Sequence, residues 1–226
     1  MILFFKILES VVPNKKFKMQ KRLLIAIDGP SASGKGTLSN SLSKKFNIPA
    51  LNTGGLYRAV AFKASQNNID LTDAKKLVEI AKNLKEEDIN NPAIFTEEVG
   101  GKASTVGKVQ ELRDALFKYQ RDFASQDGGA ILDGRDIGTV ICPDADYKFF
   151  VIASAEERAR RRYKEMIEKG QKVEYDDILL NIKERDERDM NRPNSPCKKA
   201  DDAILIDTTG KTIEEVFQYV LSFIKD

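Results

Sequence analysis

The stretch Gly29–Thr37 carries residue types at a spacing suited to binding phosphate. It reads Gly-Pro-Ser-Ala-Ser-Gly-Lys-Gly-Thr and fits the G-x-x-x-x-G-K pattern of a P-loop. Glycines let backbone N–H groups converge on phosphate oxygens, and a helix that begins at the loop directs its positive end toward them. Lys35 would place a cation beside a transferred phosphoryl group. The residues expected to bind the donor nucleotide are Gly29, Pro30, Ser31, Ala32, Ser33, Gly34, Lys35, Gly36 and Thr37.

One position of this loop departs from the usual pattern, which has Ser or Thr directly after the lysine as a magnesium ligand. Gly36 stands there, and the hydroxyl is supplied one residue later by Thr37. This variant resembles nucleoside monophosphate kinases more than GTPases, and the chain has no Asn-Lys-x-Asp motif for guanine. A glycine-rich turn that binds nothing is the alternative, but the apolar run before the loop and the helical pattern after it favour a P-loop.

Arginine is concentrated between residues 158 and 192. One cluster comprises Arg158, Arg160, Arg161 and Arg162, and a second comprises Arg185, Arg188, Asp189 and Arg192. The spacing of the second cluster puts its members on one face of a helix. A solvated face with ion pairs such as Glu184–Arg188 would explain the pattern equally well by itself. Beside a P-loop, however, arginines on a helical lid could neutralise phosphates and exclude water, and mutual repulsion should keep the lid open until anions bind.

Two further stretches follow expected strands, where parallel sheets bind ligands. In Asp133-Gly134-Arg135-Asp136, Asp133 could hold magnesium through water, Arg135 could hold phosphate and Asp136 could accept from a substrate donor. In the second stretch, residues 52–58, Thr53 is expected to cap a helix whose N-terminus faces an anion, with Arg58 one turn on. A plain Asp-Gly turn and a plain capped helix are the respective alternatives.

The elements needed to position these residues alternate along the chain. Continuous apolar runs predict buried strands at 23–27, 48–51, 130–132, 149–152 and 204–206. Amphipathic patterns between them predict helices, with Thr72 as one N-cap and with charged helices near 155–169 and 175–191. Residues 85–101, with Asn-Asn-Pro and Gly100-Gly101, show the weakest pattern. The fold class is therefore α/β, a five-stranded parallel sheet flanked by helices.

Composition excludes several classes of function. The 226 residues contain no histidine, which rules out Ser-His-Asp or Cys-His catalysis and His-ligated zinc. A net charge of +2 gives no general attraction to nucleic acid, and no apolar run is long enough to span a membrane. The two cysteines, Cys142 and Cys197, favour free thiols in the cytoplasm, with one disulfide between them as the alternative. We expect a monomer with a flexible extension at 1–19, whose deletion should change little, and a single domain at 20–226.

Taken together, the chain resembles the bacterial cytidylate kinases. The resemblance rests on Ile-Asp-Gly-Pro-Ser-Ala-Ser-Gly-Lys-Gly-Thr (27–37), Thr-Gly-Gly-Leu-Tyr-Arg (53–58), Asp-Gly-Arg-Asp-Ile-Gly-Thr-Val (133–140) and Lys-Glu-Arg-Asp-Glu-Arg-Asp (183–189). It implies a P-loop kinase fold with a CMP-binding insert at about 53–125 and a short lid at about 155–192. It also implies phosphoryl transfer from ATP, with Mg²⁺, to CMP or dCMP in pyrimidine nucleotide metabolism.

The resemblance also implies roles for individual side chains. The acceptor residues it assigns are Arg58 and Arg135 for the phosphate, Ser104, Arg113, Asp136 and Arg192 for the cytosine, Arg185 and Asp189 for the sugar, and Thr53 beside them. The catalytic residues expected are Lys35, Arg135, Arg158 and Arg162, with Thr37 and Asp133 toward the metal. The chain departs from the family pattern at Asn52, where Asp is usual, at Phe95, where many members have Arg, and in the shortness of 85–94.

Two other functions remain open from the residues. One is a kinase for a different small acceptor, such as UMP, AMP or shikimate. The other is a nucleotide-binding switch that hydrolyses slowly and signals by its shape. A second anion site separates the kinases from the switch, because a switch needs a single nucleotide pocket. Arg58, Arg113 and Arg135 lie outside the P-loop and favour a kinase.

Overall fold

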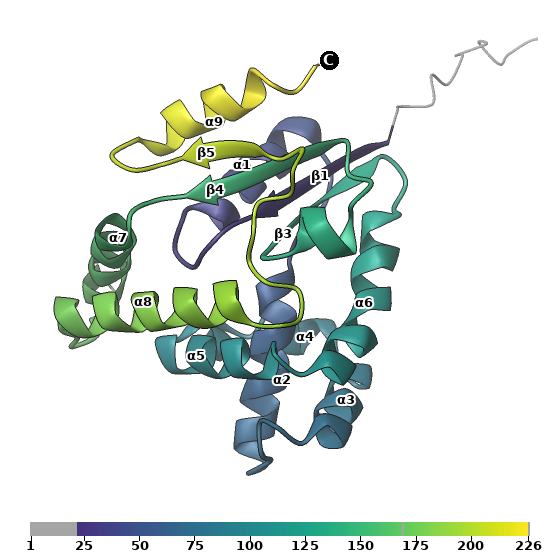
Figure 1. Ribbon diagram of the computed structural model, residues 1–226, viewed down its shortest axis with the longest axis vertical. Helices are drawn as coiled ribbons and strands as arrows, with labels where there is room; N and C mark the ends of the chain where they lie inside the picture. The colour runs from purple at the N-terminus through teal and green to yellow at the C-terminus, as the bar shows by residue number, and fades with distance from the viewer. Residues whose placement is uncertain (1–21, 169, 226) are drawn as a thin grey trace, which may run out of the picture.

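A parallel sheet forms the centre of the molecule in the computed structural model, which describes residues 22–168 and 170–225 (Figure 1). Its strands are β1 (Leu23–Asp28), β2 (Ala50–Asn52), β3 (Gly129–Gly134), β4 (Tyr147–Ile152) and β5 (Ile204–Asp207). They lie in the order β2-β3-β1-β4-β5, and every pair is parallel. The five predicted strands are confirmed. The extension expected at 1–19 lies outside the described residues.

The apolar runs form strands because both faces of the sheet are buried. On one face of β1, Ile25 and Ile27 pack in a cluster with Leu38 and Val216 from two covering helices. On the other face, Leu24 and Ala26 pack in a second cluster that also includes residues from β2, β3 and the end of a long helix. Burial on both faces accounts for the continuous rather than alternating apolar pattern.

Helices lie around the sheet in three groups. Those on the sheet are α1 (Lys35–Phe46), α9 (Ile213–Leu221) and the single turn η2 (Ile137–Ile141). A separate group packs around two apolar clusters of its own and comprises α2 (Thr53–Gln66), α3 (Ala74–Lys82), α4 (Glu86–Ile89), η1 (Pro92–Phe95), α5 (Glu97–Val106) and α6 (Gln110–Ala124). The last pair, α7 (Ala155–Glu168) and α8 (Tyr175–Asn191), packs around a further apolar cluster between the two helices. In Figure 1, α8 crosses between the sheet and the α2–α6 group.

Residues 85–101, which show the weakest pattern in the sequence, form α4, η1 and the start of α5, and Gly100 and Gly101 lie inside α5. The Thr72 cap is a wrong prediction. Asp73 caps α3 instead, because the Asp73 carboxylate accepts from the Lys76 N–H, whereas the Thr72 hydroxyl donates to Asp70. The error arises because neighbouring polar residues are each able to serve as cap or as turn residue.

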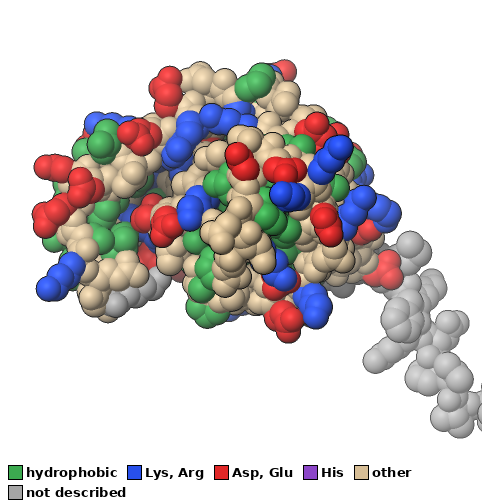
Figure 2. Space-filling model, turned by 90° about the horizontal axis from the view of Figure 1, so that it is seen from below, with side chains coloured by type: hydrophobic (Ala, Val, Ile, Leu, Met, Phe, Trp, Pro, Cys, Tyr) green, Lys and Arg blue, Asp and Glu red, His purple; other side chains and the backbone are tan. Residues whose placement is uncertain are grey.

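Cys142 and Cys197 are both free and buried. No helix within the described residues is long and apolar enough to cross a membrane. The face shown in Figure 2 carries basic and acidic side chains interspersed rather than gathered by sign.

Candidate active site

The P-loop residues connect the end of β1 to the first turn of α1. Two glycines are needed for this path. Gly29 has a φ of +142°, and a Cβ there would lie 2.0 Å from the Val151 carbonyl oxygen. Gly34 has a φ of +94° and stands at the N-cap of α1. The loop therefore begins in close contact with β4. It ends at the N-terminus of α1, whose free N–H groups point into the concave side of the loop.

Lys35 is the first residue of α1, and its side chain is buried. Its Nζ donates to the Pro30 carbonyl and, at 3.3 Å, to the Ser33 Oγ, so the side chain folds back over the loop. Burial, and next the Arg135 cation, lower the pKa of Lys35 to about 7. Burial raises the pKa of Asp133, at the end of β3, to about 6. The two groups face the same cavity.

That cavity, here called the phosphate chamber, has a volume of about 590 Å³. It joins the P-loop to side chains from the ends of β2 and β3, from η1 and α5, and from α7 and α8. Its lining beyond residues 31–37 is Asn40, Asn52, Gly54, Arg58, Phe95, Glu97, Asp133, Arg135, Arg161, Arg162, Glu165 and Arg185. The structure thus brings together Lys35, Thr37, Asp133 and four of the predicted arginines around one space. Arg158 is absent from this lining.

Arg58 is held in the chamber by the short segment that the sequence pattern left undefined. Its Nη1 donates to the carbonyls of Ile94 and Thr96 at 2.8 Å each, and its guanidinium lies 5.9 Å from the centre of the Phe95 ring. A Cβ on Gly100 would lie 2.6 Å from Arg58 Nη2, so this glycine makes room for the arginine. The sequence pattern did not indicate this use of Gly100.

The chamber holds more positive charge than its own acids neutralise. Burial lowers the pKa of Arg58 to about 9 and that of Arg185 to about 10, and in each case a neighbouring arginine adds to the effect. The Nε of Arg185 is buried without a hydrogen-bond partner among the described residues, and its ion pair with Asp189 is long, at 3.8 Å. A bound anion would relieve the repulsion and offer this donor a hydrogen bond.

A second pocket, here called the inner pocket, adjoins the chamber and has a volume of about 40 Å³. Gly54, Arg135 and Arg185 line both spaces. The complete lining of the inner pocket is Thr53, Gly54, Tyr57, Ala103, Ser104, Gly107, Arg113, Gly134, Arg135, Asp136, Arg185, Asp189 and Arg192. Every predicted acceptor residue except Arg58 is here, and Tyr57 is a member that the sequence did not indicate.

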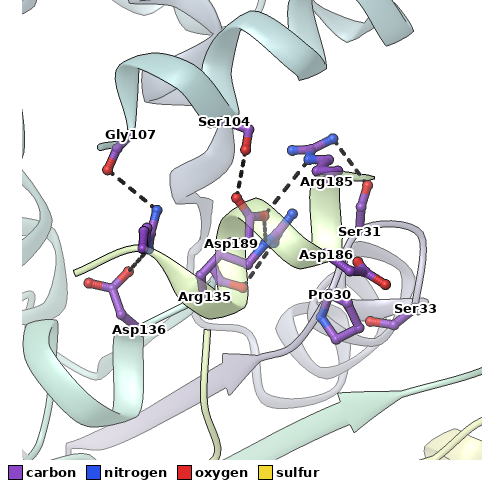
Figure 3. A network of polar contacts seen from close by, with 12 residues as sticks. Pro30, Ser31, Ser33, Ser104, Gly107, Arg135, Asp136, Arg185, Asp186 and Asp189 are labelled. Carbon is purple, nitrogen blue, oxygen red and sulfur yellow. Dashed lines mark hydrogen bonds and ion pairs between the residues drawn. The ribbon is translucent and has the colours of Figure 1, made fainter. Parts of the chain in front are cut away.

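Ion pairs close the inner pocket. Asp136 pairs with Arg113 and, at 3.6 Å, with Arg192. The Asp189 carboxylate accepts from Arg135 Nε at 2.9 Å and from Ser104 Oγ at 2.8 Å, as Figure 3 shows. The pocket is much smaller than an engineered protein cavity of about 150 Å³ that binds benzene. A nucleobase therefore enters only when some of these side chains move.

Two of the acceptor residues are placed differently from the prediction. Thr53 does not cap α2: its Oγ1 donates to the Asp133 carbonyl at 2.9 Å, while Asn52 Oδ1 accepts from the Gly55 N–H as the cap. Thr53 thereby ties the start of α2 to β3. Arg192 lies just past the end of α8 rather than on its face, and its Nε donates to the Ser195 carbonyl at 2.7 Å.

The expected repulsion among the lid arginines is also wrong, because each has an acid or carbonyl partner. Arg160 and Arg161 pair with Glu157, and Arg161 also donates to Thr208. Arg162 pairs with Glu97 across the chamber mouth, which joins α7 to α5. Arg158 is 4% exposed, away from the chamber lining. Its guanidinium donates to Asp186 at 2.5 and 3.1 Å and to the carbonyls of Ser31 and Ala153.

Arg158 thus fastens α7 to the P-loop and to α8, and its loss should affect stability more than a surface change would. Arg158→Ala leaves the Asp186 carboxylate without its bidentate partner, so we expect a loss of about 3 kcal/mol in the free energy of unfolding. Arg160→Ala, on the exposed side of α7, should change it by about 0.5 kcal/mol or less. Urea denaturation of both variants provides the measurement. Equal stability of the two would contradict the role assigned to Arg158.

An apolar cavity of about 310 Å³ lies beside the first turn of α1. Leu38 from α1 and Ile213, Val216 and Phe217 from α9 form much of its wall, and Gly34 opens it toward the P-loop. No motif in the sequence indicated this cavity. Its position after β5 could have indicated it, since ligands bind at the carboxyl ends of parallel strands.

Comparisons with known proteins agree with this geometry. The sequence model of the family described as cytidylate kinase matches residues 25–226. A cytidylate kinase of Methylocella silvestris is 46% identical over 203 residues, which is 90% of this chain and 94% of the relative. A cytidylate kinase of Clostridioides difficile is 43% identical over 210 residues, which is 88% of this chain and 97% of the relative.

A similar fold occurs in a crystal structure of an uncharacterized protein from Eubacterium ventriosum. The TM-score is 0.53 at 14% sequence identity, and the match covers 90% of this chain and 98% of that one. At that identity the likeness concerns the fold. The family match spans residues 25–226, a range that contains the P-loop and the residues of both pockets. The chain therefore belongs to the cytidylate kinase family.

Proposed function

We propose that this protein transfers the γ-phosphoryl group of ATP to CMP or dCMP, with the acceptor bound in the inner pocket. The observation that carries the proposal is the pair of adjoining polar spaces that share Arg135 and Arg185. A donor phosphate on the P-loop and an acceptor phosphate from the inner pocket would meet between these two cations. A nucleotide switch would not require the second space.

On the donor side, three parts of the chain have separate tasks. The backbone of residues 29–34 and the N-terminus of α1 bind the β- and γ-phosphates. The apolar cavity beside Leu38 and Val216 receives the adenine, which is flat and largely apolar on its faces. Lys35, already inside the chamber, contacts the phosphates when it releases the Pro30 carbonyl.

On the acceptor side, Arg58 and Arg135 bind the CMP phosphate, because both face the chamber next to the inner pocket. Deeper in, Asp189 and Arg185 bind the sugar. The base contacts the side chains of Ser104, Arg113, Asp136 and Arg192. Cytosine offers an amino donor and ring acceptors, and a carboxylate flanked by arginines is complementary to that pattern.

Catalysis then comes from alignment and from charge rather than from a general base. The acceptor oxygen is already anionic, so no strong base has to remove a proton, in keeping with a chain that lacks histidine. Lys35, Arg135 and Arg162 neutralise charge as it spreads over the transferred group. Arg158 acts through Ser31 and Asp186 and stabilises the lid on which Arg162 is carried.

The oxygen donors near Lys35 fit a Mg²⁺ ion that accompanies ATP. Asp133 and Thr37 both line the phosphate chamber, and carboxylate, hydroxyl, phosphate and water oxygens are the ligands this ion prefers. Bound there, Mg²⁺ would neutralise the β- and γ-phosphate oxygens. Asp133 would orient water in the coordination shell, and Thr37 would supply a hydroxyl from α1.

The role of Asp133 predicts a change in metal requirement. Asp133→Asn should raise the Mg²⁺ concentration for half-maximal activity by about 10-fold, since an amide holds coordinated water less strongly than a carboxylate. Asp122→Asn, on the exposed face of α6, should leave it unchanged. Titration of activity with Mg²⁺ at saturating ATP measures both. An unaltered requirement in Asp133→Asn would remove Asp133 from the metal's surroundings.

The proposed function is tested by ADP formation with ATP alone and then with each nucleoside monophosphate or shikimate added. We expect low activity with ATP alone and strong stimulation by CMP and dCMP. Slow ADP formation that no acceptor stimulates would favour the nucleotide switch. Preferential stimulation by UMP, AMP or shikimate would favour a kinase for that acceptor.

A further inference from the structure

Asp28 is a buried carboxylate to which the proposed mechanism gives no task. It ends β1, one residue before the P-loop, and is 5% exposed. Its Oδ1 accepts from the Ile137 N–H at 2.8 Å, and its Oδ2 accepts from the Gly138 N–H at 2.7 Å. These are the first two N–H groups of η2, which have no partner within the turn. Asp28 therefore caps a turn that belongs to a distant part of the chain.

The residue at the N-cap position of η2 is itself an aspartate, Asp136, and it makes no capping hydrogen bond with its side chain. Its backbone carbonyl accepts from Val140 at 2.8 Å and from Ile141 at 3.1 Å, so it does begin the turn. Aspartate at this position ordinarily turns its carboxylate back to the first free N–H groups. Here that carboxylate pairs with arginines of the inner pocket instead.

We propose that Asp28 is a positioning residue for the acceptor pocket, because it caps η2 in place of Asp136 and so leaves the Asp136 carboxylate to face the acceptor base. The same hydrogen bonds hold the backbone directly after Arg135 and Asp136. They therefore help to fix the position of the backbone from which both side chains extend. The inference rests on the proposed function for the identity of the acceptor.

The surroundings of Asp28 point to orientation rather than stability as its contribution. Burial raises its pKa to about 6 even though the amides of Gly138 and Ile137 act in the opposite direction, and nearby Asp136 raises it further. The folded protein thus disfavours this charge. The entry of the P-loop is held separately, by the close packing of Gly29 on the Val151 carbonyl. A change at Asp28 should consequently affect the acceptor site more than the donor site.

Two substitutions test this in the full-length protein. Asp28→Ala removes both acceptors, so the Asp136 carboxylate becomes the nearest partner for the free N–H groups and leaves the inner pocket. We expect the KM for CMP to rise by about 10-fold or more, with the KM for ATP within about 2-fold of wild type. Asp28→Asn retains one acceptor oxygen and should give an intermediate KM for CMP.

Asp146→Asn is the matched control, because the Asp146 carboxylate also accepts from a β1 backbone N–H, that of Leu24 at 2.8 Å, toward the opposite end of the strand. It should leave both KM values unchanged. An unchanged KM for CMP in the Asp28 variants, or equal increases in both KM values, would overturn the positioning role. Turnover of CMP by the wild type in the same assay tests the proposed function separately. If Asp28→Ala does not fold, the KM ratio of Asp28→Asn decides.

Discussion

Replacing Lys35 by alanine should lower kcat by about 10³-fold, the largest effect we expect from any single substitution. Its ammonium lies inside the phosphate chamber, where burial lowers the pKa to about 7. The charge is therefore poorly stabilised until an anion approaches, and it interacts strongly with charge that develops on the transferred group. Steady-state kinetics with ATP and CMP provide the measurement.

The stability of Lys35 variants separates this effect from damage to the fold. The pKa of the Lys35 ammonium is lower in the folded protein than in the unfolded chain. Such a group lowers the free energy of unfolding at every pH at which it is protonated in the unfolded chain, and pH 7 lies in that range. Lys35→Met, which keeps the volume without the charge, should therefore melt at or above the wild-type temperature while losing activity like Lys35→Ala. Lys45→Ala, exposed near the end of the same helix, should alter neither quantity. Near wild-type turnover in Lys35→Met would contradict the P-loop assignment.

Replacing Asp136 by asparagine should narrow the preference for CMP over UMP. A carboxylate accepts from the amino group of cytosine and repels the carbonyl of uracil, a difference worth about 1–3 kcal/mol, or roughly 5- to 150-fold in kcat/KM. An amide both donates and accepts, so it tolerates either base. The measurement is kcat/KM for both nucleotides with both proteins.

The structure supplies a control for this experiment. Asp189 lies in the same pocket and pairs with Arg135, and we assign it to the sugar, which CMP and UMP share. Asp189→Asn should lower kcat/KM for both nucleotides and leave their ratio unchanged. If the ratio of kcat/KM for CMP to kcat/KM for UMP is unchanged in Asp136→Asn, Asp136 does not discriminate between the two bases.

The sequence predicts those parts of the site in which the residue types present are compatible with only one local structure. The apolar run before Gly29 and the glycines of the loop admit few conformations, so β1, the P-loop and α1 followed directly. The arginines and aspartates of the inner pocket were identified through the resemblance to a family, and the structure gathers them in one place.

Errors occurred where a residue type has several uses and tertiary contacts choose among them. Thr53 and Asn52 are both typical caps, and the choice depends on a carbonyl of β3, remote in sequence. Gly100 lies in the stretch with the weakest pattern, and only the structure shows that it lets Arg58 pass close to α5. Arg158 and Arg162 are indistinguishable in a run of arginines, and only the partners Asp186 and Glu97 assign one to the lid's attachment and the other to the chamber.

Arg135 and Arg185 line both the phosphate chamber and the inner pocket, so with the substrates bound as we propose they would interact with donor and acceptor at once. Transfer moves a phosphoryl group from one side of these cations to the other, and the total negative charge near them stays the same. The enzyme-bound substrates and products should consequently lie close in free energy. The same arrangement would then catalyse ATP formation from ADP and CDP with comparable ease, so that the direction of net flux follows the nucleotide concentrations.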